Sequence, residues 1–312
     1  LGGRTSPKAA GGSLASTLVS LPAEIPVDGV VEATATPLTI GPSDAAPTAR
    51  WRHSAVALAE APGRVVLFGG RDGDSTFGDA WLLDVEGARW LWLDPQGEEC
   101  PRARHSHAAI AVPPSTPPSA VEPGRWTPVM LISGGLDKDE EPLSDAYVLE
   151  VQGSMEADVP NVVRWRRLSV SGRICGRFGH SAHIWEHTVF LLGGVSLEAP
   201  PGEEAPLEWW QFGPCSGEAE DEEVDVCSVC LSISSAGSDG GAGVEPPFLL
   251  HGHASVLVPG ISDALAHAAG VDVDSAARGA REAASLLVLG GGGACFSFGI
   301  HVNEATLAIR IP

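Results

Sequence analysis

A hydrophobic run that ends in two or more glycines recurs five times along this chain of 312 residues. The runs read LGG, VVLFGG, VMLISGG, VFLLGG and LLVLGGGG, and their glycines lie at 2–3, 69–70, 134–135, 193–194 and 290–293. Successive runs are separated by 59 to 97 residues. An element that returns in this way indicates a repeat protein, in which each repeat folds as one supersecondary unit.

Two further elements flank the glycines. A start bearing His or Ser precedes four of the runs, as RWRHSAVAL from Arg50, RARHSHAAIAV from Arg102, RFGHSAHIW from Arg177 and HGHASVLV from His251. The segments DAWLLDV and DAYVLEV follow the second and third runs, and each precedes a segment that carries tryptophan. We therefore predict four short strands per unit, with the glycines after the second strand and aromatic residues in the third and fourth.

This pattern resembles the kelch repeat, whose units form the blades of a β-propeller. The resemblance implies an all-β, kelch-type β-propeller over residues 1–312, with five recognisable units. A kelch unit has ~50 residues, so the longer spacings predict loop insertions, at 113–128, 217–225, 234–247 and 262–284. Because the chain opens on LGG, which reads as the end of a strand, we expect the propeller to be N-terminally truncated.

The glycines are expected to be structural, since residues without Cβ allow a sharp turn and a close approach of neighbouring backbones. The expected blade turns are Gly69, Gly70, Gly134, Gly135, Gly193, Gly194, Gly290 and Gly291. The last run looks at first like a phosphate loop, but a G-x-G-x-x-G fingerprint would need glycine at Cys295 or Phe296. No Lys-Ser or Lys-Thr follows either, so we expect no cofactor-binding residue in this chain.

Other candidate chemistry is weak. The stretch GHSAH resembles a nucleophile elbow, but His183 stands where that motif needs glycine. Cys227 and Cys230 form one C-x-x-C with Cys215 upstream, which lacks further zinc ligands and reads equally well as the third strand of its blade. We expect no catalytic and no metal-binding residue. Six residues of the repeated starts are expected to form hydrogen bonds at the blade tops: His53, His105, His180, Ser54, Ser106 and Ser181.

The net charge of −21 repels nucleic acid and anionic membranes from most of the surface, so contact with phosphate needs a local basic patch. Arginines gather before the first strands and between Arg164 and Arg177. Such arginines either form a ring at the mouth of the propeller that binds carboxylates or phosphates, or each pairs with a nearby acid. The candidates for binding a partner or tRNA are Arg52, Arg104, Arg166, Arg167 and Arg177.

Six cysteines in a chain of this length indicate a reducing compartment, and neither a signal peptide nor an apolar run of ~18 residues is present. We expect a cytosolic or nuclear protein, with the cytoplasm as the first choice, and no membrane partner.

Three stretches carry a narrower resemblance: GGGGACFSFGIHVN at 290–303, GGRTSP at 2–7 and RFGHSA at 177–182. They are similar to the kelch region of the tRNA wybutosine-synthesising protein 4 family, also called leucine carboxyl methyltransferase 2, and of plant-type fused wybutosine-synthesising proteins. The resemblance implies an upstream methyltransferase domain that binds S-adenosylmethionine and acts late in making wybutosine on phenylalanine tRNA.

In that family the propeller is implied to position the tRNA or the catalytic domain. Because these 312 residues hold no cofactor-binding glycine motif on a strand-to-helix turn, the methyltransferase either lies upstream or was never present. The alternative is a kelch protein-interaction module that binds an acidic partner peptide through an arginine-lined channel mouth.

Overall fold

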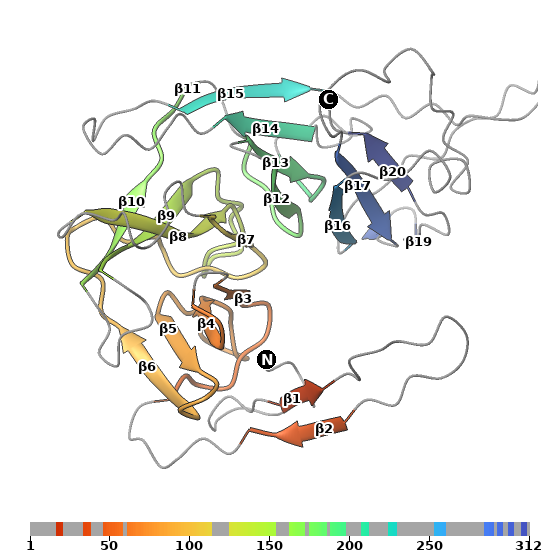
Figure 1. Cartoon of the computed structure of the whole chain (residues 1–312). Helices are drawn as coiled ribbons and strands as arrows, with labels where there is room; N and C mark the ends of the chain where they lie inside the picture. The colour runs from red at the N-terminus through yellow and green to blue at the C-terminus, as the bar shows by residue number, and fades with distance from the viewer. Residues whose placement is uncertain are drawn as a thin grey trace, which may run out of the picture. The chain divides into compact units, whose positions relative to one another are not determined.

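The computed structural model describes fifteen stretches of the chain, and the other residues are not discussed further. These stretches are residues 17–20, 34–38, 46–58, 61–113, 125–153, 162–171, 175–185, 188–197, 207–211, 224–229, 253–259, 284–289, 292–295, 299–302 and 307–310. Every element of regular structure within them is a β-strand (Figure 1). Within these ranges no helix has the length and apolar character that a bilayer crossing requires.

The strands β1 to β10 are Thr17–Ser20, Thr34–Pro37, Ser54–Ala57, Arg64–Phe68, Ala80–Asp84, Arg89–Leu93, Ala108–Ala111, Trp126–Ser133, Ala146–Gln152 and Val163–Arg167. The strands β11 to β20 are Val170–Ser171, Ser181–Trp185, Thr188–Leu192, Leu207–Gln211, Val224–Val229, Ala254–Pro259, Ala284–Leu289, Gly292–Cys295, Gly299–Val302 and Leu307–Arg310.

Four-stranded sheets in sequence order dominate the architecture. β3 to β6 form one such antiparallel sheet, and β7 to β10 form a second with the same strand order. β12 to β15 form a third, to which β11 adds a parallel strand at the outer edge of β15. The three-stranded sheet β16-β17-β20 and the hairpins β1-β2 and β18-β19 complete the set. The expected all-β class with blade-type sheets is thus confirmed, and a double glycine follows the second strand of each four-stranded sheet.

Several expected boundaries are wrong. The C-x-x-C segment was assigned to a third strand, but Cys227 lies in β15, the fourth strand, because β14 occupies the third position. Strand β8 begins at Trp126, inside the insertion expected at 113–128, and β15 begins at Val224, inside the acidic insertion at 217–225. The insertion at 234–247, the first and last glycine turns at 2–3 and 290–291, Cys215, Cys230 and Arg173 lie outside the described residues.

The chain divides into two compact units. The first comprises Leu1–Ile132, Leu136–Glu141 and Tyr147–Arg167, and the second comprises Ser133–Gly135, Pro142–Ala146 and Leu168–Pro312.

The hydrophobic core of the first unit lies between the sheets β3–β6 and β7–β10. Phe68 from the first sheet and Trp165 from the second meet edge to face, with ring centroids 4.9 Å apart. Met130 and Leu149 are fully buried in the same cluster. Aromatic residues of the later strands therefore fill the space between the blades, as the sequence predicted. Such a pair adds about 1 kcal/mol to the stability that its buried area provides.

The opposite face of β3–β6 carries a second, smaller cluster. Leu67, Leu83 and Trp90 are buried there, while Trp92 on the same strand as Trp90 remains 56% exposed. The two tryptophans lie two residues apart and so share a face of β6. Only the part of this face near Trp90 is therefore covered.

Candidate loop-end site

The repeated Arg-x-x-His start has one register in all three four-stranded sheets. The residue after each double glycine forms an antiparallel bridge with a residue of the start, in the pairs Arg71 with Trp51, Leu136 with His105 and Val195 with Phe178. Trp51, His105 and Phe178 are therefore equivalent. Consequently Arg50, Arg104 and Arg177 are equivalent, and so are His53, His107 and His180.

This register corrects the alignment expected for the second unit. The letters of RARHS suggest that Arg102 and His105 match Arg50 and His53. The bridges instead match Arg104 and His107 to that pair, because hydrogen bonding to the glycine turn, and not the similarity of letters, sets the position.

All three equivalent arginines are buried, and Arg50 and Arg177 bond the first carbonyl of a glycine turn. Arg50 has no exposed side-chain area, donates to the carbonyl of Gly69 over 3.1 Å, and grips both carboxylate oxygens of Asp79 at 2.5 and 2.9 Å. Arg177 donates to the carbonyl of Gly193 over 3.4 Å. Burial alone would raise the pKa of Asp79, but the hydrogen bonds from Arg50 and Trp81 outweigh it and lower that pKa.

The arginine candidates consequently separate into groups. Arg104 is 0% and Arg177 1% exposed, so neither presents its guanidinium group to a partner, and the expectation for these two is corrected. Arg166 donates to one carboxylate oxygen of Glu150 at 2.8 Å, and Arg164 donates to the other at 2.8 Å. Arg164 and Arg166 therefore pair with a nearby acid, as in the second alternative given for the arginines, and do not form a free ring.

Arg52 and Arg167 are exposed and remain candidates for binding a partner.

Serine and histidine side chains connect successive starts, as expected for structural residues. Ser54 lies 2.7 Å from Nε2 of His107, and Ser181 lies 2.9 Å from Nε2 of His253. A Ser–His pair that recurs at equivalent positions is a packing device, since a single active site would not be repeated. His180 departs from the expected hydrogen bonding, because neither of its buried ring nitrogens has a hydrogen-bond partner among the described residues.

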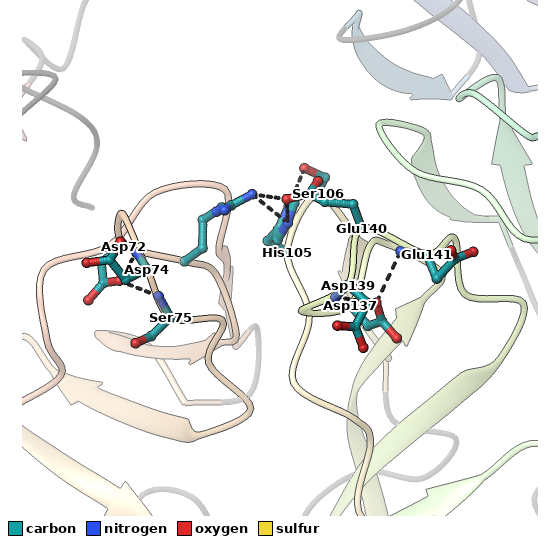
Figure 2. Close-up of polar contacts among 10 residues, drawn as sticks. Asp72, Asp74, Ser75, His105, Ser106, Asp137, Asp139, Glu140 and Glu141 are labelled. Carbon is teal, nitrogen blue, oxygen red and sulfur yellow. Dashed lines mark hydrogen bonds and ion pairs between the residues drawn. The ribbon is translucent and has the colours of Figure 1, made fainter.

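A polar cluster that the other two described glycine turns do not repeat lies where the loops of the first unit meet (Figure 2). Arg71, which follows the double glycine, pairs with the carboxylate of Glu140, and the same Nη1 lies 3.2 Å from Nε2 of His105. Oε1 of Glu140 lies 3.6 Å from that imidazole nitrogen. Nδ1 of His105 contacts the hydroxyl of Ser106 at 3.1 Å. One carboxylate oxygen is thus faced by a guanidinium group and by an oriented imidazole.

Burial and charge both act on the ionisation of this cluster. Burial lowers the pKa of His105, and the positive charge of Arg71 lowers it further. Burial acts to raise the pKa of Glu140, but the hydrogen bond and charge of Arg71 outweigh it, so this pKa is lowered. Arg52 adds positive charge that acts on both groups. Near neutral pH the cluster therefore holds an ionised Glu140 beside a neutral His105.

Neither Arg71 nor Glu140 belongs to a sequence motif that predicts a binding site. The sequence signal that could have identified them is a difference in length between two otherwise similar turns, which follow the glycine pairs at 69–70 and 134–135. In GGRDGDST the Asp72 amide bonds the carbonyl of Ser75, whereas in GGLDKDEE the Asp137 amide bonds the carbonyl of Glu141, one residue further on. Glu140 is the extra residue, and its φ of +61° turns the chain so that its carboxylate reaches Arg71.

No metal or cofactor site follows from the described residues. They contain no group of three or more His, Cys, Asp or Glu arranged to hold a metal ion. Gly292 and Gly293 begin strand β18, which pairs with β19, so this backbone does not fit a phosphate-binding loop that leads into a helix.

Comparison with known proteins gives relatives for most of the chain, although no protein-family model matches it. tRNA wybutosine-synthesizing protein 4 of Rattus norvegicus is 29% identical over 211 residues, which are 67% of this chain and 25% of that protein. The chain is similar to the wybutosine-synthesizing proteins. This confirms the resemblance that the sequence motifs predicted.

Other relatives share the similarity. An adagio-like protein 2 of Oryza sativa subsp. japonica is 26% identical over 221 residues, 69% of this chain and 29% of that protein. A solved structure, "Structure of YjhT", aligns with a TM-score of 0.46 at 14% identity, over 89% of this chain and 67% of that chain. The chain spans about a quarter of the length of the curated relatives that it matches.

Proposed function

We propose that this chain is the non-catalytic, kelch-type propeller part of a cytoplasmic tRNA-modifying protein. It supports S-adenosylmethionine-dependent methylation in wybutosine biosynthesis on phenylalanine tRNA. The observation that carries the proposal is the 29% identity to tRNA wybutosine-synthesizing protein 4 over 211 residues. S-adenosylmethionine would be bound by a methyltransferase domain outside these 312 residues, and the propeller would hold that domain in place.

The charge of the chain favours a role in positioning the methyltransferase domain over direct binding of the tRNA. The net charge is −21, and the two described loop ends carry carboxylates at Asp72, Asp74, Asp137, Asp139 and Glu141. A polyanion meets repulsion at such a surface. Arg52 and Arg167 are the exposed candidates through which a phosphate could still be held.

The test measures transfer of a radiolabelled methyl group from S-adenosylmethionine to phenylalanine tRNA. We expect no transfer by this chain alone, and at least about a tenfold loss when a protein that carries it loses the propeller. Turnover by the chain alone, or full activity without the propeller, would contradict the proposal. A salt titration of tRNA binding, with Arg167→Ala as the variant and Arg166→Ala as its neighbour, separates direct contact from positioning, because a phosphate contact steepens the salt dependence.

A second candidate function, a protein-interaction module for an acidic partner, is favoured by one observation. The Arg71 guanidinium and the His105 imidazole already face a carboxylate, and Arg71 interrupts positions that Leu136 and Val195 occupy in the equivalent turns. The blade does not require arginine at this position, since leucine and valine occupy it in the other two described turns.

A further inference from the structure

We propose that the Arg71 guanidinium, positioned by His105, forms a carboxylate-binding site, which Glu140 fills in the free protein and which an acidic side chain of a protein partner takes over. This proposal deepens the second candidate function and is independent of the tRNA proposal.

The site itself is built from rigid parts. His105 is fully buried, and its backbone is held by two hydrogen bonds to Leu136 at 2.9 Å. Ser106 fixes the opposite ring nitrogen at 3.1 Å. Arg71 extends from the residue after the double glycine, with 24% of its side chain exposed. Nη1 of Arg71 donates to Nε2 of His105 over 3.2 Å, so the buried imidazole holds the guanidinium group in place. A guanidinium group held in this way binds an anion more strongly than a flexible surface cation does, because less side-chain freedom is lost.

The occupant is held loosely. Glu140 is 53% exposed, and an ion pair with a partly exposed partner stabilises a fold only weakly. Its φ of +61° is a left-handed conformation, which is unfavourable for a residue other than glycine. The extra residue in this turn therefore places a carboxylate on Arg71 at a backbone cost that nearly cancels its benefit. An intramolecular ligand with so little net stabilisation is readily displaced by a partner that makes additional contacts.

The surroundings select the class of partner. Asp72 and Asp137 each turn a carboxylate inward to accept backbone amides of their own loops, at 2.7 to 3.1 Å. Asp74, Asp139 and Glu141 add negative charge nearby, so a nucleic acid strand would meet repulsion beyond its first phosphate. A single glutamate or aspartate of a protein, flanked by uncharged or basic residues, avoids this repulsion and matches the carboxylate that the site already holds.

The experiment measures binding of small anions to the protein by the NMR shift of the His105 ring. The probe is acetyl-Gly-Glu-Gly-amide, with acetyl-Gly-Gln-Gly-amide as the uncharged control and inorganic phosphate as the alternative anion. Glu140→Gln removes the internal competitor, whereas Glu141→Gln makes the same charge change on the same loop without a contact to Arg71. An internal competitor acts at millimolar effective concentration or above.

We expect the glutamate probe to bind about two- to fivefold more tightly to Glu140→Gln than to the unmodified protein, and with unchanged affinity to Glu141→Gln. Adding Arg71→Met, or the milder Arg71→Lys, to Glu140→Gln should weaken binding again by at least about fivefold. Equal affinities for Glu140→Gln and Glu141→Gln overturn the proposal. So does phosphate binding tighter than the glutamate probe, or binding that Arg71 variants leave unchanged. None of these readouts involves tRNA or methyl transfer, so failure here leaves the first function untouched.

Discussion

The amide of Gly70 donates a hydrogen bond over 2.8 Å to the carbonyl of Arg104, and Gly135 bonds Arg177 in the same way at 2.8 Å. The double glycine of one blade therefore donates a backbone hydrogen bond to the Arg-x-x-His start of the next blade. A Cβ on Gly69 would lie 2.6 Å from the Arg104 carbonyl oxygen and 3.0 Å from the His107 ring, and one on Gly134 would lie 2.5 Å from the Arg177 oxygen. These close approaches explain why the runs at 69–70 and 134–135 end in glycine.

Replacing Gly69 by alanine is expected to lower the free energy of unfolding by at least about 2 kcal/mol, because left-handed backbone strain adds to the contact with Arg104. Gly97 has a φ of +106° and open space around it, so a side chain there meets backbone strain but no steric contact. Gly97→Ala should therefore lower the free energy of unfolding by about 1 kcal/mol. Gly73 has neither constraint, so Gly73→Ala should change stability by less than about 1 kcal/mol. Urea denaturation ranks the three, and a cost for Gly69→Ala no greater than that for Gly97→Ala would rule out the close approach.

Truncating Trp165 to alanine is expected to cost about 3 to 5 kcal/mol, since this side chain is 3% exposed and fills the space beside Phe68. Trp92→Ala is the matched control, and because Trp92 is 56% exposed it should cost under about 1 kcal/mol. The measurement is the midpoint of denaturant unfolding for both variants. Similar losses for the two tryptophans would mean that the core does not lie between these sheets.

His180 predicts a pH dependence of stability. Burial lowers its pKa to about 3, and the charge of Arg177 acts in the same direction. The unfolded chain, with a histidine pKa of about 6.5, binds the proton first. Stability that is present above pH 6.5 is therefore lost as the pH falls from about 6.5 toward 3, by up to about 1.4 kcal/mol per unit.

Unfolding measured at pH 7 and pH 5 checks this expectation. His180→Gln keeps a neutral polar side chain of similar size, so its stability should fall less between these two pH values than that of the unmodified protein. Ring NMR should also show His180 neutral at pH 5. An identical pH slope in both proteins, or a titration of His180 near pH 6.5, would contradict the assignment.

The repeat pattern was enough to predict the all-β class and the place of the glycine turns, because glycine pairs and alternating apolar residues reflect local backbone requirements. It also predicted that Ser54 and Ser181 form hydrogen bonds, and that aromatic residues such as Trp165 fill the space between sheets. These inferences needed only the order of residues along each unit, which the fold repeats.

The tertiary structure alone decided which arginines are available and which residues form the loop-end site. Arg104 and Arg52 look alike in the sequence, yet one is fully buried and the other exposed, because the bridge to the glycine turn shifts the second unit by two residues. Arg71 and Glu140 stand 69 residues apart, and no local pattern connects them. Their meeting depends on the packing of two blades and on one extra residue in a turn, which are long-range properties that a reading of local motifs does not contain.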